Sequence, residues 1–134
     1  DSSHVIPALI KKIYKAKTNQ ESSVEIWGDG TASREFLYVE DLVQAITLSI
    51  KLQTITKPIN IGTGKEITIK ELAHKIKDIL DYQGDLSFNK KYPNGQPRRC
   101  VDTNMAKNML NFDHITDLDT GLERSIDWFV KRCI

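Results

Sequence analysis

Residues 23–37 read Ser-Val-Glu-Ile-Trp-Gly-Asp-Gly-Thr-Ala-Ser-Arg-Glu-Phe-Leu. The first five, Ser23 to Trp27, alternate polar and apolar side chains, which is typical of a strand with one buried face. The next three, Gly28 to Gly30, predict a turn, because glycine adopts backbone angles that other residues avoid. A short apolar piece, Phe36 to Val39, comes after the turn. This part of the chain therefore predicts a strand that ends in a tight turn, followed by an exposed loop and a second extended segment.

Five helices are predicted around that strand from apolar residues at helical spacing. They cover residues 5–17, 41–52, 68 to about 84, 104–110 and 117–133. The strongest local signal is at Thr68, which forms a capping box with Glu71. Ile67 and Leu72 beside it have the spacing of a hydrophobic staple. Apolar residues cover a wide face of the 41–52 helix, so we expect that helix to be buried on more than one side.

Two more short strands are predicted at residues 58–61 and 86–88, and residues 92–99, which include two prolines, are predicted to form a loop. Long helices thus alternate with few, short strands. The predicted fold class is α/β and helix-rich. A chain of 134 residues has the size of one common domain, so a single domain with its own core is expected.

Composition and charge exclude several classes of function. Hydrophobic residues make up 40% of the chain, as in an ordinary globular protein, so disorder is not expected. The formal net charge is only +1 and like charges do not form long runs, so nucleic acid is not expected as a partner. The apolar runs are far shorter than the roughly 20 residues of a membrane span, so a membrane is not expected either.

The two cysteines, Cys100 and Cys133, show neither a CxxC pair nor the spacing of metal ligands. No metal site is therefore predicted. No secretory signal pattern opens the sequence, so we expect both thiols to be reduced and the protein to be cytoplasmic. Residue 1 is Asp rather than Met, so we expect the chain to be a processed or excised piece.

Two glycine pairs resemble parts of a cofactor-binding loop. Gly28-Asp29-Gly30 and Gly62-Thr63-Gly64 each lack the third glycine that a dinucleotide-binding loop places at a fixed spacing. Both are therefore interpreted as plain turns.

Four polar or aromatic positions have two interpretations each. Trp27 offers a ring for stacking and Arg34 a forked donor for phosphate oxygens, or both belong to an ordinary exposed loop. Arg99, next to another arginine in a proline-bounded loop, clamps an anion or forms part of a solvated edge. His4 stands close to a helix start, which disfavours its protonated form, so it is a neutral acid/base group or a structural histidine.

Five segments of the chain, in this order, resemble the C-terminal part of the extended short-chain dehydrogenase/reductase family, also called the NAD-dependent epimerase/dehydratase family. They are Ser3–Ile10, Trp27–Leu37, Asn60–Gly64, Ile69–Ala73 and Gly95–Arg99. The second and third segments are shared by many members. The first is typical of a narrower branch that epimerises and reduces GDP-linked 4-keto sugars.

The resemblance implies roles for eight residues. His4 corresponds to the family's acid in epimerisation next to a ketone. Seven others correspond to substrate-binding positions: Val5, Leu9, Lys12, Ile26, Trp27, Arg34 and Arg99. Among these, Ile26 and Trp27 are at the strand end that receives the nucleotide, and Arg34 is on the diphosphate side. Relatives often have Arg where this chain has Lys12 and Lys where it has Arg99, which changes the donor geometry at both positions.

The family also implies parts that this sequence does not contain. Its members bind NADP(H) through an N-terminal glycine loop and reduce a ketone with a Ser, Tyr and Lys set, and Cys100 does not match the family's catalytic cysteine. We therefore expect residues 1–134 to be a substrate-binding C-terminal domain that lacks the N-terminal Rossmann domain. Alone it is expected to bind no NADP(H) and to be inactive, and its parent is expected to be a homodimer.

The leading interpretation is the nucleotide-sugar-binding portion of an NADPH-dependent epimerase/reductase. One alternative is the substrate domain of an enzyme with the same fold that acts on another nucleotide sugar, such as a 4-epimerase or a dehydratase. The other is a non-catalytic module that binds sugar nucleotides.

Overall fold

The structure is a computed structural model that describes residues 4–52 and 57–132. Its helices are α1 (Val5–Thr18), α2 (Val39–Ile50), α3 (Ile69–Ile79), α4 (Asn104–Leu110) and α5 (Leu118–Arg132). Its strands are β1 (Ser23–Trp27), β2 (Ser33–Glu35), β3 (Glu66–Thr68), β4 (Asp85–Asn89) and β5 (Arg98–Arg99). The predicted helix-rich α/β class, with few short strands, is confirmed. No helix in the described ranges is long and apolar enough to cross a membrane.

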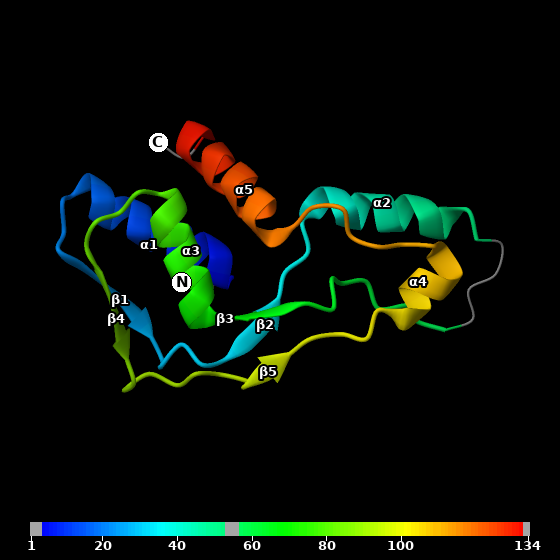
Figure 1. The fold of residues 1–134 in the computed structure, drawn as a ribbon, viewed down its shortest axis with the longest axis horizontal. Coiled ribbons are helices and arrows are strands. Elements are labelled where there is room, and N and C mark those ends of the chain that lie inside the picture. Colours follow the sequence, from blue (N-terminus) through cyan, green and yellow to red (C-terminus); the bar gives the residue numbers. More distant parts are fainter. Residues whose placement is uncertain (1–3, 53–56, 133–134) are drawn as a thin grey trace.

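The larger apolar core lies where α1, α3 and α5 pack with the β1–β4 pair (Figure 1). β1 and β4 run parallel, with Val24 opposite Leu86 and Trp27 opposite Asn89. Ile13 of α1 and Ile76 of α3 are fully buried in this core. Close packing around these side chains fixes the end of β1, where Trp27 lies, relative to α1.

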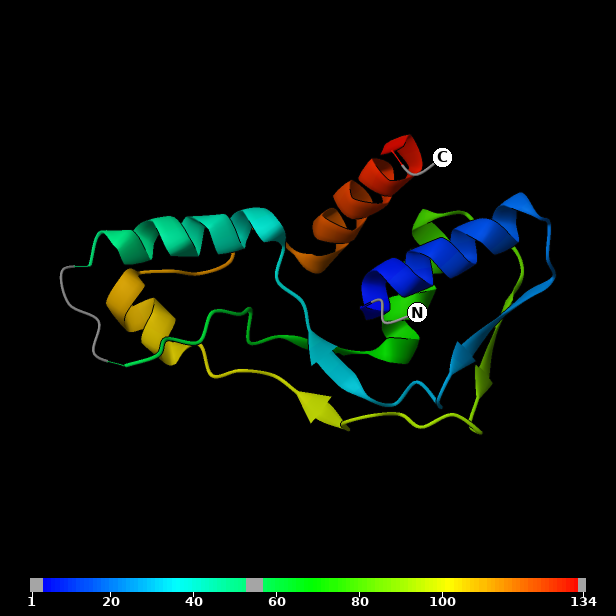
Figure 2. The ribbon, with the colours of Figure 1, turned by 180° about the vertical axis from the view of Figure 1, so that it is seen from behind.

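A second, three-stranded sheet has the order β3-β2-β5. β2 is antiparallel to β3 and parallel to β5. Figures 1 and 2 show this sheet between the larger core and the part of the molecule that holds α2 and α4. β2 therefore carries the chain from the glycine turn after β1 across the middle of the molecule.

A smaller core forms between α2 and α4 from Ala45, Ala106, Leu110 and Phe112. The other side of α2 carries five exposed apolar side chains, here named the α2 row: Val39, Leu42, Val43, Ile46 and Ile50. The prediction that this helix is buried on more than one side is wrong for this chain. The apolar spacing along the helix predicts a wide apolar face, but the described part of the chain leaves the α2 row exposed to solvent.

The local signals have mixed outcomes. The capping box at Thr68 is confirmed, with Glu71 N–H donating to the Thr68 hydroxyl at 3.1 Å. Residues 58–61 form no strand, because Pro58 has no N–H to donate and no described strand pairs with the segment. Arg98 and Arg99, predicted as loop, instead pair with β2.

Cys100 is a free, half-buried thiol, and its burial raises the pKa of the thiol. Cys133 lies outside the described residues. That both cysteines are reduced stays a prediction.

Candidate functional site

The end of β1 presents an exposed aromatic pair. The Trp27 indole is 61% exposed, and the Tyr92 ring stacks on it with 4.5 Å between centroids and 12° between planes. Lys12 of α1 places its ammonium 5.4 Å from the indole centroid and donates to the Glu25 carbonyl at 2.8 Å. Lys12 and Trp27, both predicted to bind substrate, are thus brought together by the packing of α1 against β1.

The glycine turn after Trp27 is held by the loop between β4 and β5. Gly28 has a φ of +84°, and a Cβ there would clash with the Asn94 side chain. The Asp29 N–H donates to the Asn94 side-chain oxygen at 2.7 Å. The Asp29 carboxylate accepts from the Thr31 hydroxyl at 2.6 Å and from the Thr31 N–H at 2.9 Å. The first glycine pair is therefore a turn, as predicted.

These hydrogen bonds, chiefly the one from the Thr31 hydroxyl, lower the pKa of Asp29 to about 2. A depressed carboxyl pKa means that the charged form stabilises the folded turn above the ordinary value of 3.8. That contribution is lost as the pH falls through about 2. We expect the Asp29 side-chain carbon to titrate near 2 by NMR, and Thr31→Val to move its midpoint up toward 3.8. A wild-type midpoint already near 3.8 would contradict this account of the turn.

Two arginines lie side by side in the central sheet. Arg34 on β2 is directly opposite Arg99 on β5. Within the described ranges neither guanidinium forms an ion pair, and Arg34 Nη1 donates only to its neighbour's carbonyl, at Ser33, at 2.6 Å. Arg98, by contrast, is held by Glu66, with Nε within 3.0 Å of both carboxylate oxygens, and its hydrogen bond lowers the pKa of Glu66. The sheet therefore brings two predicted diphosphate ligands together and leaves their charges available.

Glu35, next to Arg34, holds two distant loops to β2. Its carboxylate accepts from the N–H groups of Thr63 at 3.1 Å, Gly64 at 2.9 Å and Val101 at 2.6 Å. The N–H groups of Thr63 and Gly64 in the second glycine pair are therefore already bonded to a carboxylate and are not available to a phosphate. A Cβ at Gly62 would lie 2.8 Å from the same carboxylate, so this close approach needs glycine. The prediction of a turn is confirmed here too.

Glu35→Ala is expected to lower the free energy of unfolding by about 2–3 kcal/mol, because three backbone donors lose a charged acceptor in a half-buried position. Urea unfolding followed by circular dichroism measures the change. Glu40→Ala is the matched control: its ion pair with Arg124 at 3.1 Å is exposed, so its loss costs less than about 1 kcal/mol. Equal effects for the two variants would show that Glu35 does not hold the loops.

The sequence of this chain is similar to several known proteins. The family model described as "NAD dependent epimerase/dehydratase family" matches residues 1–62. A GDP-L-fucose synthase of Sinorhizobium fredii is 40% identical over 131 residues, which are 98% of this chain and 41% of the relative. Residues 1–62 therefore match the NAD-dependent epimerase/dehydratase family, and the chain as a whole is similar to a part of a GDP-L-fucose synthase.

Two further proteins extend the comparison. A probable GDP-L-fucose synthase 1 of Oryza sativa is 35% identical over the whole chain and 40% of its own length. The solved structure of a GDP-mannoheptose C4 reductase from Campylobacter jejuni, with NADP bound, has a TM-score of 0.84 and 30% identity, covering 97% of this chain and 46% of that one. The chain thus spans about 40% of the length of the curated epimerase/dehydratase relatives it matches.

The remaining family-derived positions fall into two groups. His4 is exposed at the N-cap of α1, and its side chain makes no capping hydrogen bond. Val5 is half-buried at the start of the same helix. Leu9 and Ile26 are each 4% exposed and belong to the larger core. In this structure Leu9 and Ile26 therefore pack in the core beneath the candidate site. Their direct contact with a substrate stays a prediction.

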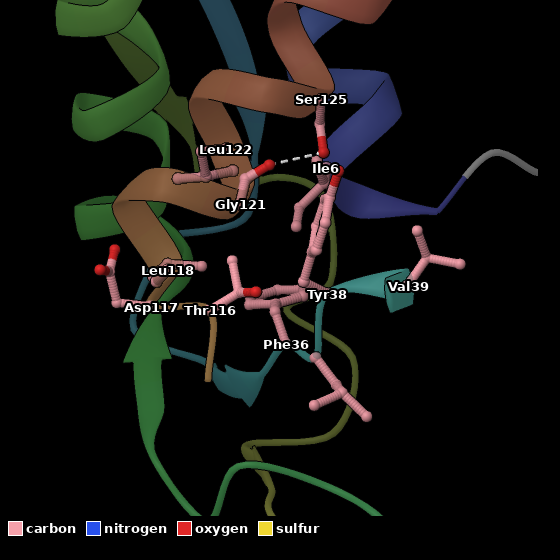
Figure 3. Close-up of a pocket in the computed structure, with 11 residues that line it drawn as sticks. Ile6, Phe36, Tyr38, Val39, Thr116, Asp117, Leu118, Gly121, Leu122 and Ser125 are labelled. Atoms are coloured by element: carbon pink, nitrogen blue, oxygen red, sulfur yellow. Dashed lines mark hydrogen bonds between the residues drawn. The ribbon is translucent and has the colours of Figure 1, made fainter. Parts of the chain in front are cut away.

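A cavity of about 230 Å³ lies between the start of α1, the segment before α2 and the first turns of α5 (Figure 3). Its lining includes Ile6, Phe36, Tyr38 and Thr116. The Ser125 hydroxyl, which also lines it, donates to the Gly121 carbonyl at 2.7 Å. None of the eight predicted site residues lines this cavity, and His4 is two positions before Ile6. The aromatic pair and the two arginines are likewise not among the residues that line it.

Sequence reasoning missed three residues that contact the predicted site residues or the loops beside them. Tyr92 stacks on Trp27, Asn94 holds the glycine turn, and Glu35 holds the loops beside Arg34. Asn94-Gly95 in the predicted loop indicated a turn, but no sequence signal connects it with residues more than 60 positions earlier.

Proposed function

We propose that this chain binds the nucleotide sugar in an NADPH-dependent epimerase/reductase of the GDP-L-fucose synthase kind. The observation that carries the proposal is the placement of Arg34 opposite Arg99, both without an acidic partner in the described ranges. Guanidinium forks match phosphate oxygens in pairs, and a net charge of +1 gives little general attraction for an anion. The names of the relatives in the comparison support a GDP-linked sugar as the ligand.

The exposed Trp27 completes this site. Its ring lies at the end of β1, one glycine turn before Arg34, and supplies a surface on which a nucleobase stacks. Lys12 adds a positive charge at the indole. The loop of residues 90–97 connects the two ends, because Tyr92 stacks on Trp27 and Gly95 approaches the Arg34 guanidinium. A base at Trp27 and a diphosphate at the arginines fit this order.

His4 is assigned to proton transfer at the sugar. It stands at the start of α1, exposed and free of a capping role, so its imidazole is available to a ligand. As the acid of an epimerisation it would give a proton to the carbon next to the ketone after a base has removed one from the other face.

The cofactor requires residues outside this chain. The two glycine pairs are turns whose donors are used internally, so the residues present do not fit the NADP(H) diphosphate. We assign NADP(H) binding and hydride chemistry to the part of the relatives that this chain does not span. The α2 row supports that division, because five large apolar side chains on one helix face are typical of a surface that another part of the protein covers.

A second candidate is a GDP-sugar C4 reductase that does not epimerise, which the 30% identical C. jejuni structure favours. It uses the same base and diphosphate sites and makes no use of His4 as an acid. The two candidates therefore differ in the His4 variant described in the Discussion.

The test of the proposed function is calorimetric titration of the 134-residue chain with GDP, UDP and guanosine. Saturable binding of GDP, with weaker binding of both UDP and guanosine, supports a site for a guanine nucleotide diphosphate. Equal affinity for GDP and guanosine would contradict the role of the arginines, and no binding of any of the three would contradict the function itself.

A further inference from the structure

Tyr92 is an aromatic residue whose position the folding of the chain does not require. It is 40% exposed and belongs to neither apolar core. Its ring nevertheless lies parallel to Trp27 at 4.5 Å between centroids. Both rings remain open to solvent, so the fold presents a double aromatic surface instead of burying either ring.

The loop that carries Tyr92 is fixed on both sides of the ring. Before it, Asn89 at the end of β4 accepts from the Tyr92 N–H at 3.3 Å and from the Gly28 N–H at 3.0 Å. After it, the Asn94 side chain accepts from the Asp29 N–H at 2.7 Å. These bonds join the loop to the turn that follows Trp27. The stacking geometry of the two rings is therefore built into the backbone before any ligand arrives.

The surroundings of the pair match one end of a nucleotide. The Lys12 ammonium lies 5.4 Å from the indole centroid. A Cβ at Gly95 would lie 3.8 Å from the Arg34 guanidinium, so the same loop passes from the rings to the arginines. A planar base needs an aromatic face, and its phosphates need donors such as Arg34 and Arg99.

We propose that Tyr92 is a base-stacking residue of the nucleotide site, and that it acts with Trp27 as a preformed platform for the nucleobase. The proposal rests on the function proposed above and adds a residue to it. Stacking depends on the ring and not on the phenol hydroxyl. It also acts on the base and not on the phosphates. Removing the ring should therefore lower the affinities for nucleoside and nucleotide by the same factor.

The test uses Trp27 as the reporter. The chain has two tryptophans, and Trp128 lies on α5, 56% exposed, so Trp128→Phe leaves the Trp27 fluorescence as the signal. In that background, GDP, guanosine and inorganic pyrophosphate are titrated into the chain and into its Tyr92→Ala and Tyr92→Phe variants. Circular dichroism and urea unfolding check that each variant is folded.

Tyr92→Ala is expected to lower the affinities for GDP and guanosine by the same factor, about tenfold. It should change the affinity for pyrophosphate by less than about twofold. Tyr92→Phe is expected to keep all three affinities within twofold. Arg34→Ala, in contrast, should lower the affinities for GDP and pyrophosphate but not the affinity for guanosine. Unchanged or tighter GDP binding by Tyr92→Ala overturns the role of Tyr92 while the proposed function stands. An equal loss in Tyr92→Phe also overturns it. If GDP fails to quench Trp27 in the Trp128→Phe chain, both proposals fall.

Discussion

Replacing Arg34 and Arg99 together by alanine is expected to weaken GDP binding by at least about a hundredfold. Each guanidinium is available for a charge-assisted hydrogen bond, which contributes about 1.5–3 kcal/mol, and each 1.4 kcal/mol is about a factor of ten in affinity. Arg34→Ala alone is expected to weaken GDP roughly tenfold or more for the same reason. Calorimetry of the chain at physiological salt measures both, since general electrostatic attraction is screened there.

Arg98→Ala is the matched control for this pair. Arg98 has the same charge and is the next residue to Arg99 on β5, but its guanidinium is held by Glu66. Its loss should change GDP affinity by less than about threefold, as expected when only screened, long-range charge is removed. An Arg98→Ala variant that loses as much affinity as the double variant would show that net charge, and not the in-register pair, attracts the ligand.

His4→Ala is expected to lower turnover by about a hundredfold or more in the enzyme that carries this sequence with a nucleotide-binding portion. The Michaelis constant should stay within about twofold, because a lost general acid affects the transition state and not substrate binding. Steady-state kinetics with a GDP-linked 4-keto sugar measure both. Since the His4 side chain caps nothing, the variant should fold normally and bind GDP as the wild type does.

The control for this variant is His74→Gln. His74 is exposed on α3, with its ring nitrogen 2.8 Å from the Lys70 carbonyl one turn earlier, and has no place in the proposed site. Its turnover should equal that of the wild type. Unchanged turnover in His4→Ala would remove the catalytic assignment and favour the non-epimerising C4 reductase.

Local features of the fold were predictable because their causes lie within a few residues of each other. The capping box at Thr68 is set by residues three positions apart, and the alternation of Ser23–Trp27 specifies one buried face of β1.

The long-range features were not predictable from the same patterns. β5 exists only because Arg98 and Arg99 meet a strand more than 60 residues earlier, and the Glu35 carboxylate reaches N–H groups at Thr63 and Val101. No periodicity records such pairings. The exposed α2 row shows a second limit of sequence patterns. Apolar spacing predicts that a helix face is suited to burial, but it does not predict whether this chain supplies the residues that bury it.

The site residues divide in the same way. Trp27 and Arg34 could be proposed from their chemistry and the family resemblance. That Arg99 lies opposite Arg34, and that Tyr92 stacks on Trp27, follows only from the folded geometry.

The most direct measurement is an NMR titration of the isotope-labelled chain with GDP, followed at the indole N–H and arginine Nε–H signals. The structure predicts shifts at Trp27, Arg34 and Arg99, because one loop stacks Tyr92 on Trp27 and brings Gly95 near the Arg34 guanidinium, and β5 places Arg99 opposite Arg34. It predicts no shift at Trp128 on α5 or at Arg98, which Glu66 already holds. Shifts confined to Trp128 or Arg98, or saturation by GDP without any change at Trp27, Arg34 and Arg99, would contradict the account.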